Sequence, residues 1–352
     1  MRFFYLLIVL LSIAMEKITG HLLLLIFLLL LACDSKDKIK FSKVRLKKQV
    51  SVLSDSSFFG DVRDVLLHNG YLLITNFSQN RLLLCDTAFN TAVNYGGAGD
   101  GPGEFRGVIK SYIKSDMVFA FDEYHGTLSL FSLGGKFVKK ITYPQRIFAF
   151  TRFTVDDSLK IYVAGPEKDS SMLKLDTSGQ IVRQFGSVFP SKNFREKRAR
   201  SYKHILCSKD NQLICVSLSE PYIEFYSKNG KKLREFNLSD SPYLKKRLAF
   251  AEQQCRQDPK KRESTYSLFS DAYLANDHLY LLYIDQDEKN QPDVDKVLVY
   301  TVESNNLQFY KALDLSADGK RLWYDAIAVT NDEKMIYAYE GVLNEWRIFS
   351  IQ

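Results

Sequence analysis

The chain has 352 residues, of which 46% are hydrophobic and 25% charged, with 48 Lys and Arg against 41 Asp and Glu and a formal net charge of +7. This composition excludes a disordered chain, a collagen-like repeat and a disulfide-dense miniprotein. Aromatic residues make up 13% of the chain while Pro and Met are scarce, so a large β-rich domain is expected. The basic excess suggests nucleic acid only if the charge is spread over the whole molecule.

Two apolar runs occupy the N-terminal segment, at residues 3–14 and 22–31. Neither run reaches the roughly 18 to 20 residues that span a bilayer. Read from Met15, the segment has a short polar region with one Lys, an apolar core and a small residue before the cut, which is typical of a signal peptide. Residues 1–32 are therefore predicted to be a signal peptide, with Met15 as the true start. A membrane anchor over residues 3–32 is the alternative, and the charged residues in its middle disfavour it.

The sequence Leu30-Leu31-Ala32-Cys33 resembles the lipobox of bacterial lipoproteins. The resemblance implies that Cys33 becomes the N-terminal residue after cleavage and carries fatty-acyl chains such as palmitate, which hold a soluble body at the membrane. Residues 33–56 are predicted to be the lipidated tether and a closing strand. The expected location is the cell envelope, in the outer membrane, and the expected partner there is the membrane itself.

The other four cysteines are isolated and form no CxxC motif, which disfavours a zinc knuckle and a thioredoxin-type site. Cys207 and Cys215 flank a predicted turn, so their spacing permits a disulfide without requiring one. Buried single thiols are the favoured interpretation.

A pattern of short strands recurs from residue 57 to residue 352. The most regular strands each follow a turn rich in Asn, Asp or Gly, and they lie at 71–75, 117–121, 159–163, 212–216, 278–282 and 335–339. With the strands around them they form antiparallel meanders of about 40 to 45 residues, the size of a propeller blade. The sequence therefore predicts an all-β, six-bladed β-propeller. Its last blade lacks one strand, and residues 39–52 are predicted to supply it and to close the ring.

The glycine-rich segment 97–105 resembles the interblade turn of NHL-type and TolB-like six-bladed propellers. Residues 323–330 and 336–341 are similar to the closing blade of the TolB-like propeller lipoproteins of diderm bacteria. The resemblance covers residues 33–352. It implies a fold and an envelope location, but no reaction, because propellers carry many functions.

Three further features have a chemical interpretation, and each has a simpler structural one. The glycine-rich segment is followed by a strand rather than a helix, so a turn is favoured over a phosphate-binding loop. The acidic run 285–295 lacks the spacing of a calcium loop, and a solvated loop is favoured. The histidines of the body are isolated, so turn or edge-strand positions are favoured over metal ligands; they are His68, His125, His204 and His278.

Three insertions lengthen the later blades, at 191–203, 241–264 and 285–295. Propeller connectivity places all three on one face, at the mouth of the central channel. The insertion 241–264 is predicted to be helical, with Ser241 as N-cap, Pro242 at the first helical position and an end before Asp258. Such a helix either packs on the rim or forms a lid over the channel.

Basic residues are concentrated in few segments. The insertion 191–203 holds six basic residues and one acidic residue, the insertion 241–264 holds seven and three, and residues 33–48 hold seven and two, so the remaining body is net acidic. An extracytoplasmic protein does not meet the genome, which excludes nucleic acid. We hypothesise a basic lid that binds an anionic glycan, lipid headgroup or protein; the alternative is that these charges only solvate long loops. The predicted basic lid comprises Lys192, Arg195, Lys197, Arg198, Arg200, Lys245, Lys246 and Arg247.

Two functions remain open. The leading one is an envelope-anchored binding or scaffold module; the alternative is a propeller hydrolase or lyase with a site at the channel mouth. No catalytic signature, metal motif or cofactor motif occurs in the body, so neither a cofactor nor a catalytic residue is assigned. The starts of the predicted inner strands supply the candidate mouth residues Arg63, Arg106, Arg146, Asp271, Tyr324 and Asp325.

Overall fold

The computed structural model describes residues 40–54, 58–143, 150–167, 169–263, 266–286, 289, 291–304, 306–316 and 321–351. The chain divides into a unit of residues 1–40 and a unit of residues 41–352, and the second unit is described below. The predicted signal peptide, Met15, Cys33 and Arg146 lie outside the described residues. In the described part of the chain, no helix combines the length and the apolar character needed to cross a bilayer.

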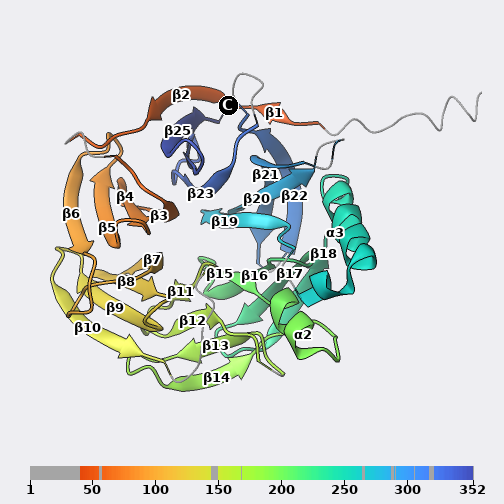
Figure 1. Cartoon of the computed structure of the whole chain (residues 1–352), viewed down its shortest axis with the longest axis horizontal. Helices are drawn as coiled ribbons and strands as arrows, with labels where there is room; N and C mark the ends of the chain where they lie inside the picture. Colours follow the sequence, from red (N-terminus) through yellow and green to blue (C-terminus); the bar gives the residue numbers. More distant parts are fainter. Residues whose placement is uncertain are drawn as a thin grey trace, which may run out of the picture. The chain divides into compact units, whose positions relative to one another are not determined.

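Six β-sheets surround a central axis, so the predicted six-bladed β-propeller is confirmed (Figure 1). Within each blade, strands that follow one another in the chain lie side by side from the axis to the rim and pair antiparallel. The strands of blades 1 to 3 are β3 (Val62–His68), β4 (Tyr71–Asn76), β5 (Arg81–Asp86), β6 (Thr91–Gly96), β7 (Val108–Lys114), β8 (Met117–Asp122), β9 (Thr127–Ser132), β10 (Phe137–Thr142), β11 (Thr154–Val155), β12 (Ile161–Ala164), β13 (Met172–Leu175) and β14 (Ile181–Phe185).

Blades 4 to 6 follow the same plan, with helices inserted before blades 4 and 5. Their elements are α2 (Phe194–Arg200), β15 (Lys203–Cys207), β16 (Gln212–Ser217), β17 (Tyr222–Ser227), β18 (Lys232–Asn237), α3 (Lys245–Gln257), the 3-10 helix η1 (Pro259–Glu263), β19 (Phe269–Ala275), β20 (His278–Gln286), β21 (Pro292–Glu303), β22 (Asn306–Asp314), β23 (Tyr324–Val329), β24 (Met335–Glu340) and β25 (Glu345–Ser350).

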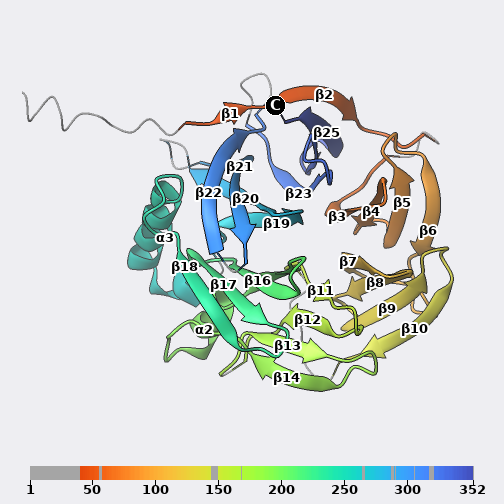
Figure 2. The same ribbon diagram turned by 180° about the vertical axis from the view of Figure 1, so that it is seen from behind.

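The N-terminal part of this unit closes the ring, as predicted. The strand β2 (Arg45–Val50) pairs antiparallel with β25 and becomes the outer strand of blade 6. The short strand β1 (Ser42–Lys43) pairs parallel with β22, the outer strand of blade 5 (Figure 2). One segment therefore joins two neighbouring blades and covers two sheet edges that would otherwise be open to aggregation.

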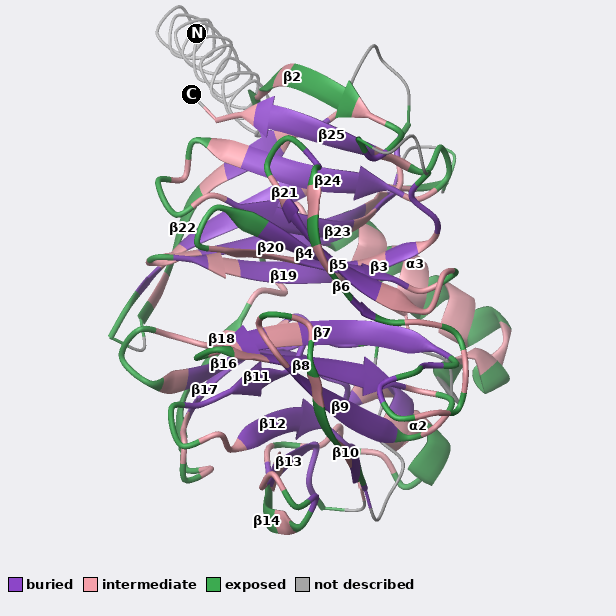
Figure 3. Ribbon diagram, turned by 90° about the vertical axis from the view of Figure 1, so that its left-hand side faces the viewer, coloured by how far each residue is buried: buried purple, intermediate pink, exposed green. Residues whose placement is uncertain are grey.

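Burial explains why the middle strands of the blades are apolar on both faces. Each blade is packed between two others, so Leu72, Leu73 and Ile74 of β4 are all fully buried although they alternate between faces. The outer strands instead face solvent, and β18 is almost entirely exposed (Figure 3). The fully buried Trp346 packs edge-on against Phe59 with ring centroids 6.1 Å apart, which joins blade 6 to the segment before blade 1.

The glycine-rich segment 97–105 is a turn, in agreement with the structural interpretation. Ala98 forms a parallel bridge with Phe105, whose side chain is fully buried. Gly96, just before this segment, has φ of +76°, and a Cβ there would lie 2.1 Å from the Phe105 ring. A residue with a side chain therefore fits neither the backbone conformation nor the space.

The helical insertion starts later than predicted. The helix α3 begins at Lys245 instead of Pro242, because residues 241–244 form a turn in which the Leu244 amide donates to the Ser241 carbonyl. Leu244 is fully buried in the core of blades 4 and 5, and this anchoring holds the turn outside the helix. The helix ends before Asp258, as expected. The helix α2 in the first insertion was not predicted; the Asn193 side chain caps it.

Two other expectations need correction. Most of the insertion 285–295 is not a solvated loop, because β20 and β21 extend into it and Asp295 is buried; residues 287–288 and 290 lie outside the described part. Cys207 and Cys215 are free thiols, as the favoured interpretation held, but only Cys215 is buried and Cys207 is half-buried. We use "insertion face" for the face of the propeller from which α2 and α3 project (Figure 3); η1 packs against both helices.

Candidate functional site

A single arginine fills the centre of the propeller. Arg152 precedes the two-residue strand β11 of blade 3, and its side chain is 4% exposed. Its guanidinium group donates two hydrogen bonds to Asp271 of blade 5, from Nε and Nη2, each of 2.6 Å. Nη1 lies 3.2 Å from Asp64 Oδ1 of blade 1. The channel is therefore occupied by a buried cation held between two carboxylates.

Backbone groups complete this arrangement. Arg152 donates to the carbonyls of Val65 at 3.2 Å and Ile327 at 3.0 Å, and the Ile327 amide donates back to Asp271 at 3.0 Å. Lys110 of blade 2 lies 3.5 Å from Asp64. We call Asp64, Lys110, Arg152, His204 and Asp271 the channel network. These residues come from blades 1 to 5, and the backbone of Ile327 adds contacts from blade 6.

The network keeps its charges although it is buried. Burial disfavours the charge on Arg152, but Asp271 and Asp64 outweigh that effect and raise its pKa above the ordinary value. Burial also disfavours the charged form of Asp271, and Arg152 and Lys110 outweigh it and lower the pKa of that carboxyl. The two pKa values shift in opposite directions, and each shift keeps its member of the bidentate ion pair charged.

His204 is the neutral member of the network. It lies in β15, the innermost strand and one edge of its sheet, which agrees with the expected edge-strand position, and it is fully buried. Its Nδ1 accepts a hydrogen bond of 3.2 Å from the Arg152 amide. Burial, together with the positive charges of Lys110 and Arg152, outweighs the opposing effect of Asp271 and lowers the pKa of His204 to about 3.

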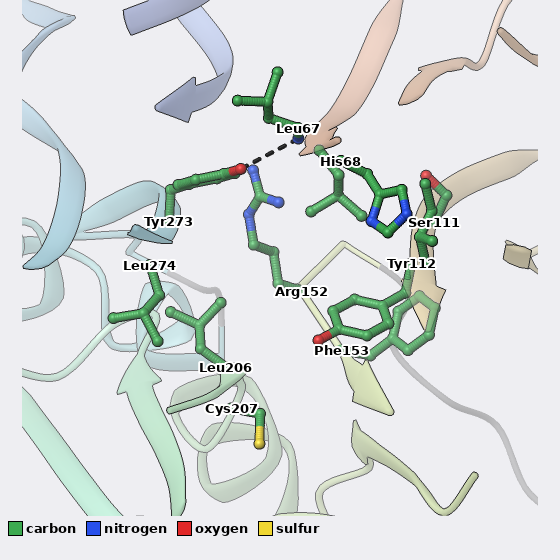
Figure 4. A pocket seen from close by; sticks show the side chains of 12 residues that line it. Leu67, His68, Ser111, Tyr112, Arg152, Phe153, Leu206, Cys207, Tyr273 and Leu274 are labelled. Atoms are coloured by element: carbon green, nitrogen blue, oxygen red, sulfur yellow. Dashed lines mark hydrogen bonds between the residues drawn. The ribbon is translucent and has the colours of Figure 1, made fainter. Parts of the chain in front are cut away.

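The network divides the channel into two cavities. The inner cavity, of about 170 Å³, lies at the ends of the inner strands and includes His68, Tyr112 and Tyr273 (Figure 4). There the Arg152 guanidinium lies over the Tyr273 ring, 5.3 Å from its centroid, and the Tyr273 hydroxyl accepts from the Leu67 amide at 3.2 Å. The mouth cavity, of about 330 Å³, lies at the starts of the inner strands and is lined by Arg63, Lys110, Trp323 and Asp325 among others.

Two predicted mouth residues line the mouth cavity. Arg63 pairs with Asp61 at 2.6 Å, and its guanidinium lies 5.4 Å from the Phe77 ring. Asp325 accepts a hydrogen bond of 3.1 Å from Trp323 Nε1. Burial, in spite of the nearby Arg63, raises the pKa of Asp325 to about 6.

The other described mouth candidates lie elsewhere. Asp271 is below the mouth, in the channel network. Tyr324 is fully buried and faces the core, where its hydroxyl donates to the Leu315 carbonyl at 3.1 Å, because strand alternation turns it away from the side taken by Asp325. Arg106 lies in an exposed turn and pairs with Asp100, which also contacts His125 Nε2 at 2.8 Å.

A larger cavity lies between the two helical insertions. This groove has a volume of about 630 Å³ and is bounded by α2, α3, η1 and the turn between β16 and β17. Its aromatic lining residues are Phe189, Tyr222 and Tyr266, and its arginines are Arg200, Arg256 and Arg262. The arginines share the groove with Glu196, Glu220 and Glu252.

Ion pairs organise the groove. Arg200 lies over the Phe189 ring, 3.7 Å from its centroid, and donates to Glu220 at 2.5 Å. Arg256 pairs with Glu252 at 2.5 Å, but these side chains are 72% and 64% exposed. The first pair is part of the wall, whereas the second is open to exchange with a ligand.

The predicted basic lid lies on the rim of the propeller and does not cover the channel mouth. Neither α2 nor α3 contributes a residue to the mouth cavity, and both lie at the periphery of blades 4 and 5 (Figure 1). Arg198 and Arg247 are tied down, to the Tyr202 hydroxyl at 3.2 Å and to Gln286 at 2.9 Å. The exposed members are Lys192, Arg195, Lys245 and Lys246; Lys197 is half-buried, as is Arg200.

Sequence reasoning missed Arg152, Lys110 and Asp64. Asp64 and Lys110 lie in β3 and β7, inner strands that also hold other polar residues, so no sequence pattern distinguished them. Arg152 lies next to a strand too short to be recognised. In the part of the chain that the structure describes, no group of three or more His, Cys, Asp or Glu side chains is arranged to hold a metal ion.

No protein-family model and no curated protein matches the sequence. Solved structures do resemble the fold. A DUF4221 family member from Bacteroides vulgatus is similar with a TM-score of 0.58 and 11% identity, over 88% of this chain and 97% of that one. A candidate exported protein from Bacteroides fragilis is similar with a TM-score of 0.53 and 13% identity, over 86% and 84% of the two chains.

A third similar structure is an enzyme. It is a catalytically inactive histidine variant of virginiamycin B lyase from Staphylococcus aureus with quinupristin, with a TM-score of 0.51 and 13% identity, over 87% of this chain and 99% of that one. At such low identities the likeness concerns the fold alone. The chain is a six-bladed β-propeller whose structural neighbours include a lyase and a candidate exported protein.

Proposed function

We propose that this chain is an envelope-anchored lipoprotein related to the TolB-like and NHL-type propellers, and that its propeller is a binding or scaffold module for an anionic partner. The groove between the helical insertions is the observation that carries the proposal. It is the largest of the cavities described above, it lies on the insertion face, and arginines and aromatic rings line it together. The leader with its lipobox-like Cys33 and the likeness to a candidate exported protein support the envelope location.

The lining of the groove suits a partner with both anionic and ring-like groups. Guanidinium groups bind carboxylate, phosphate and sulfate through paired hydrogen bonds. Aromatic walls such as Tyr222 and Tyr266 add contact area. The exposed Arg256–Glu252 pair contributes little to stability, so an incoming anion can take the place of Glu252 at small cost.

Binding assays on the mature, lipidated protein in detergent micelles test the proposal. The probes are acidic glycans, anionic phospholipid vesicles and acidic envelope proteins, each titrated at several salt concentrations. We expect binding to at least one probe, weakening with salt, and a loss of about tenfold when Arg256→Gln is combined with Arg262→Gln. Lys136→Gln with Lys231→Gln, on turns of the opposite face, is the control. Unchanged affinity in the arginine variant contradicts the proposal.

A hydrolase or lyase with its site at the channel mouth is the second candidate, and Asp325 favours it. Its pKa of about 6 suits a general acid or base near neutral pH, and it lies in a cavity with Arg63 and Lys110. A Cβ on Gly341 would lie 1.8 Å from Asp325 Oδ2, so Gly341 makes room for this carboxylate. Turnover of quinupristin or of a glycan that is lost in Asp325→Asn would support this candidate over binding alone.

A further inference from the structure

We infer that the insertion face docks on the anionic headgroup surface of the bilayer that holds the protein. This inference rests on the proposed function, because it requires the lipid anchor at Cys33 and names the anionic partner of the insertion face. The argument uses the position at which the chain enters the propeller, the length of the tether and the distribution of charge.

The chain enters the propeller beside α3. Phe41 packs edge-on against Tyr243, with ring centroids 5.3 Å apart, and Lys296 Nζ lies 5.8 Å from the Phe41 ring. Tyr243 in turn packs against Phe309 of β22 at 5.4 Å. Since Tyr243 lies two residues before the first residue of α3, these contacts fix the entry point next to the helix.

The tether is too short to let α3 move far from the membrane. Eight Cα-to-Cα steps lead from Cys33 to Phe41, and at about 3.3 to 3.6 Å per step they span at most about 26 to 29 Å. An acylated Cys33 lies at the bilayer surface, so Phe41 stays within that distance of the headgroups, and Tyr243 next to the start of α3 is in contact with it. Tethering also raises the effective concentration of the surface, which makes weak individual contacts sufficient.

The helix next to this entry point, and the 3-10 helix that packs against it, carry exposed basic residues. Lys245 and Lys246 open α3, and Lys260 and Arg262 lie in η1, which packs against both α2 and α3.

Most carboxylates of the insertions are engaged. Glu252 pairs with Arg256, and Glu196 and Glu220 pair with Arg200. The Asp258 side chain accepts a hydrogen bond from the Lys260 amide. Asp240, before the turn that leads into α3, is an exposed carboxylate. The exposed charge of the two helical insertions, 191–203 and 241–264, is therefore mainly positive, whereas the insertion 285–295 is net acidic.

The charge distribution also sets the orientation. Each Lys or Arg near an anionic leaflet strengthens binding by about fivefold, and the attraction falls off within about 10 Å. The remaining body of the propeller, which includes the insertion 285–295, is net acidic, so an anionic surface repels it while it attracts the two helical insertions. The two effects together turn the insertion face toward the bilayer.

Lysine labelling on vesicles tests this orientation. The mature, lipidated protein is reconstituted into phosphatidylcholine vesicles with and without phosphatidylglycerol, and acetylation of each lysine is measured by mass spectrometry. We expect about fivefold protection of Lys245, Lys246 and Lys260 when the anionic lipid is present. Lys136 and Lys231, which are exposed on turns of the opposite face, are the controls and should label equally in both vesicles.

A charge reversal sharpens the test. Lys245→Glu with Lys246→Glu should remove the protection of Lys260, whereas Lys136→Glu with Lys231→Glu should leave it unchanged. A vesicle-bound protein whose lysines label equally in both vesicles overturns the docking inference and leaves the anchor intact. Protection that is the same without anionic lipid overturns it too. A protein that does not remain with the vesicles overturns the anchor, and the inference with it.

Discussion

The channel network and the insertion face use the same residue types in opposite ways. In the channel, Arg152 is 4% exposed and makes a bidentate pair with Asp271. On the insertion face, Arg256 is 72% exposed and touches Glu252 through a single pair. The difference shows that environment decides the role: desolvation makes a buried charge depend on its partner, while solvent leaves an exposed charge available to a ligand.

Burying a charge is costly unless partners satisfy it. The channel network meets this requirement by collecting carboxylates, a neutral imidazole and backbone carbonyls from all six blades around Arg152. Such a centre fixes how the blades close around the axis. We therefore expect the channel to govern stability and the insertion face to govern binding, and the following predictions test that division.

The largest effect should come from removing the central cation. Arg152→Ala leaves Asp271 and Asp64 buried without their main counter-charge, so the free energy of unfolding should fall by about 3 to 5 kcal/mol. Urea denaturation measures it. The control is Arg256→Ala, whose exposed pair predicts a loss below about 1 kcal/mol. Equal losses in the two variants would contradict the division between the regions.

The next effect is a loss of unfolding free energy at acidic pH, through His204. The pKa of His204 is about 3 in the folded chain against 6.5 as the ordinary value, so protonation favours the unfolded state. Its contribution to stability is complete above pH 6.5 and falls by about 1.4 kcal/mol per pH unit as the pH drops toward 3. His204→Gln should flatten the pH dependence of the unfolding free energy between pH 6.5 and 4.5, where the lowered pKa of Asp271 has not yet been reached. A slope equal to that of the natural chain would show that His204 is not held neutral.

A smaller effect of opposite sign is expected at the channel mouth. The pKa of Asp325 rises from 3.8 to about 6 on folding, so the stability that its protonated form provides is lost as the pH rises from 3.8 through 6. Asp325→Asn should therefore raise the unfolding free energy at pH 7 by about 1 to 2 kcal/mol and have little effect at pH 4. Denaturation curves at the two pH values measure the difference. Destabilisation at pH 7 would mean that the ionised carboxylate supports the fold.

The smallest effect is expected on the insertion face. Lys245 and Lys246 are exposed, so Lys245→Glu with Lys246→Glu should change the unfolding free energy by less than about 0.5 kcal/mol. Thermal and urea unfolding of this variant provide the measurement. A loss above about 1 kcal/mol would show that these lysines have a structural role, which would remove the contrast with the channel.

The strand pattern predicted the six blades and the closing strand because alternating and apolar runs depend on local chain geometry. The same pattern failed at Arg152, since β11 has only two residues and the chain before it carries no periodic signal. It also placed the start of α3 at Pro242, where capping chemistry favoured it, whereas burial of Leu244 decided the outcome. Of the mouth candidates, Arg63 and Asp325 line the mouth cavity, and Tyr324 does not.

The sequence by itself determined the repeated blades, the ring closure and the concentration of basic residues in the insertions, because these follow from residue order and spacing. Only the tertiary structure decided which charges are buried and which remain exposed. Asp64, Lys110, Arg152, His204 and Asp271 come from five blades and are far apart in the chain, so no local pattern relates them. Their shared role arises where the inner strands converge on the axis, exclude water and leave each charge dependent on the others.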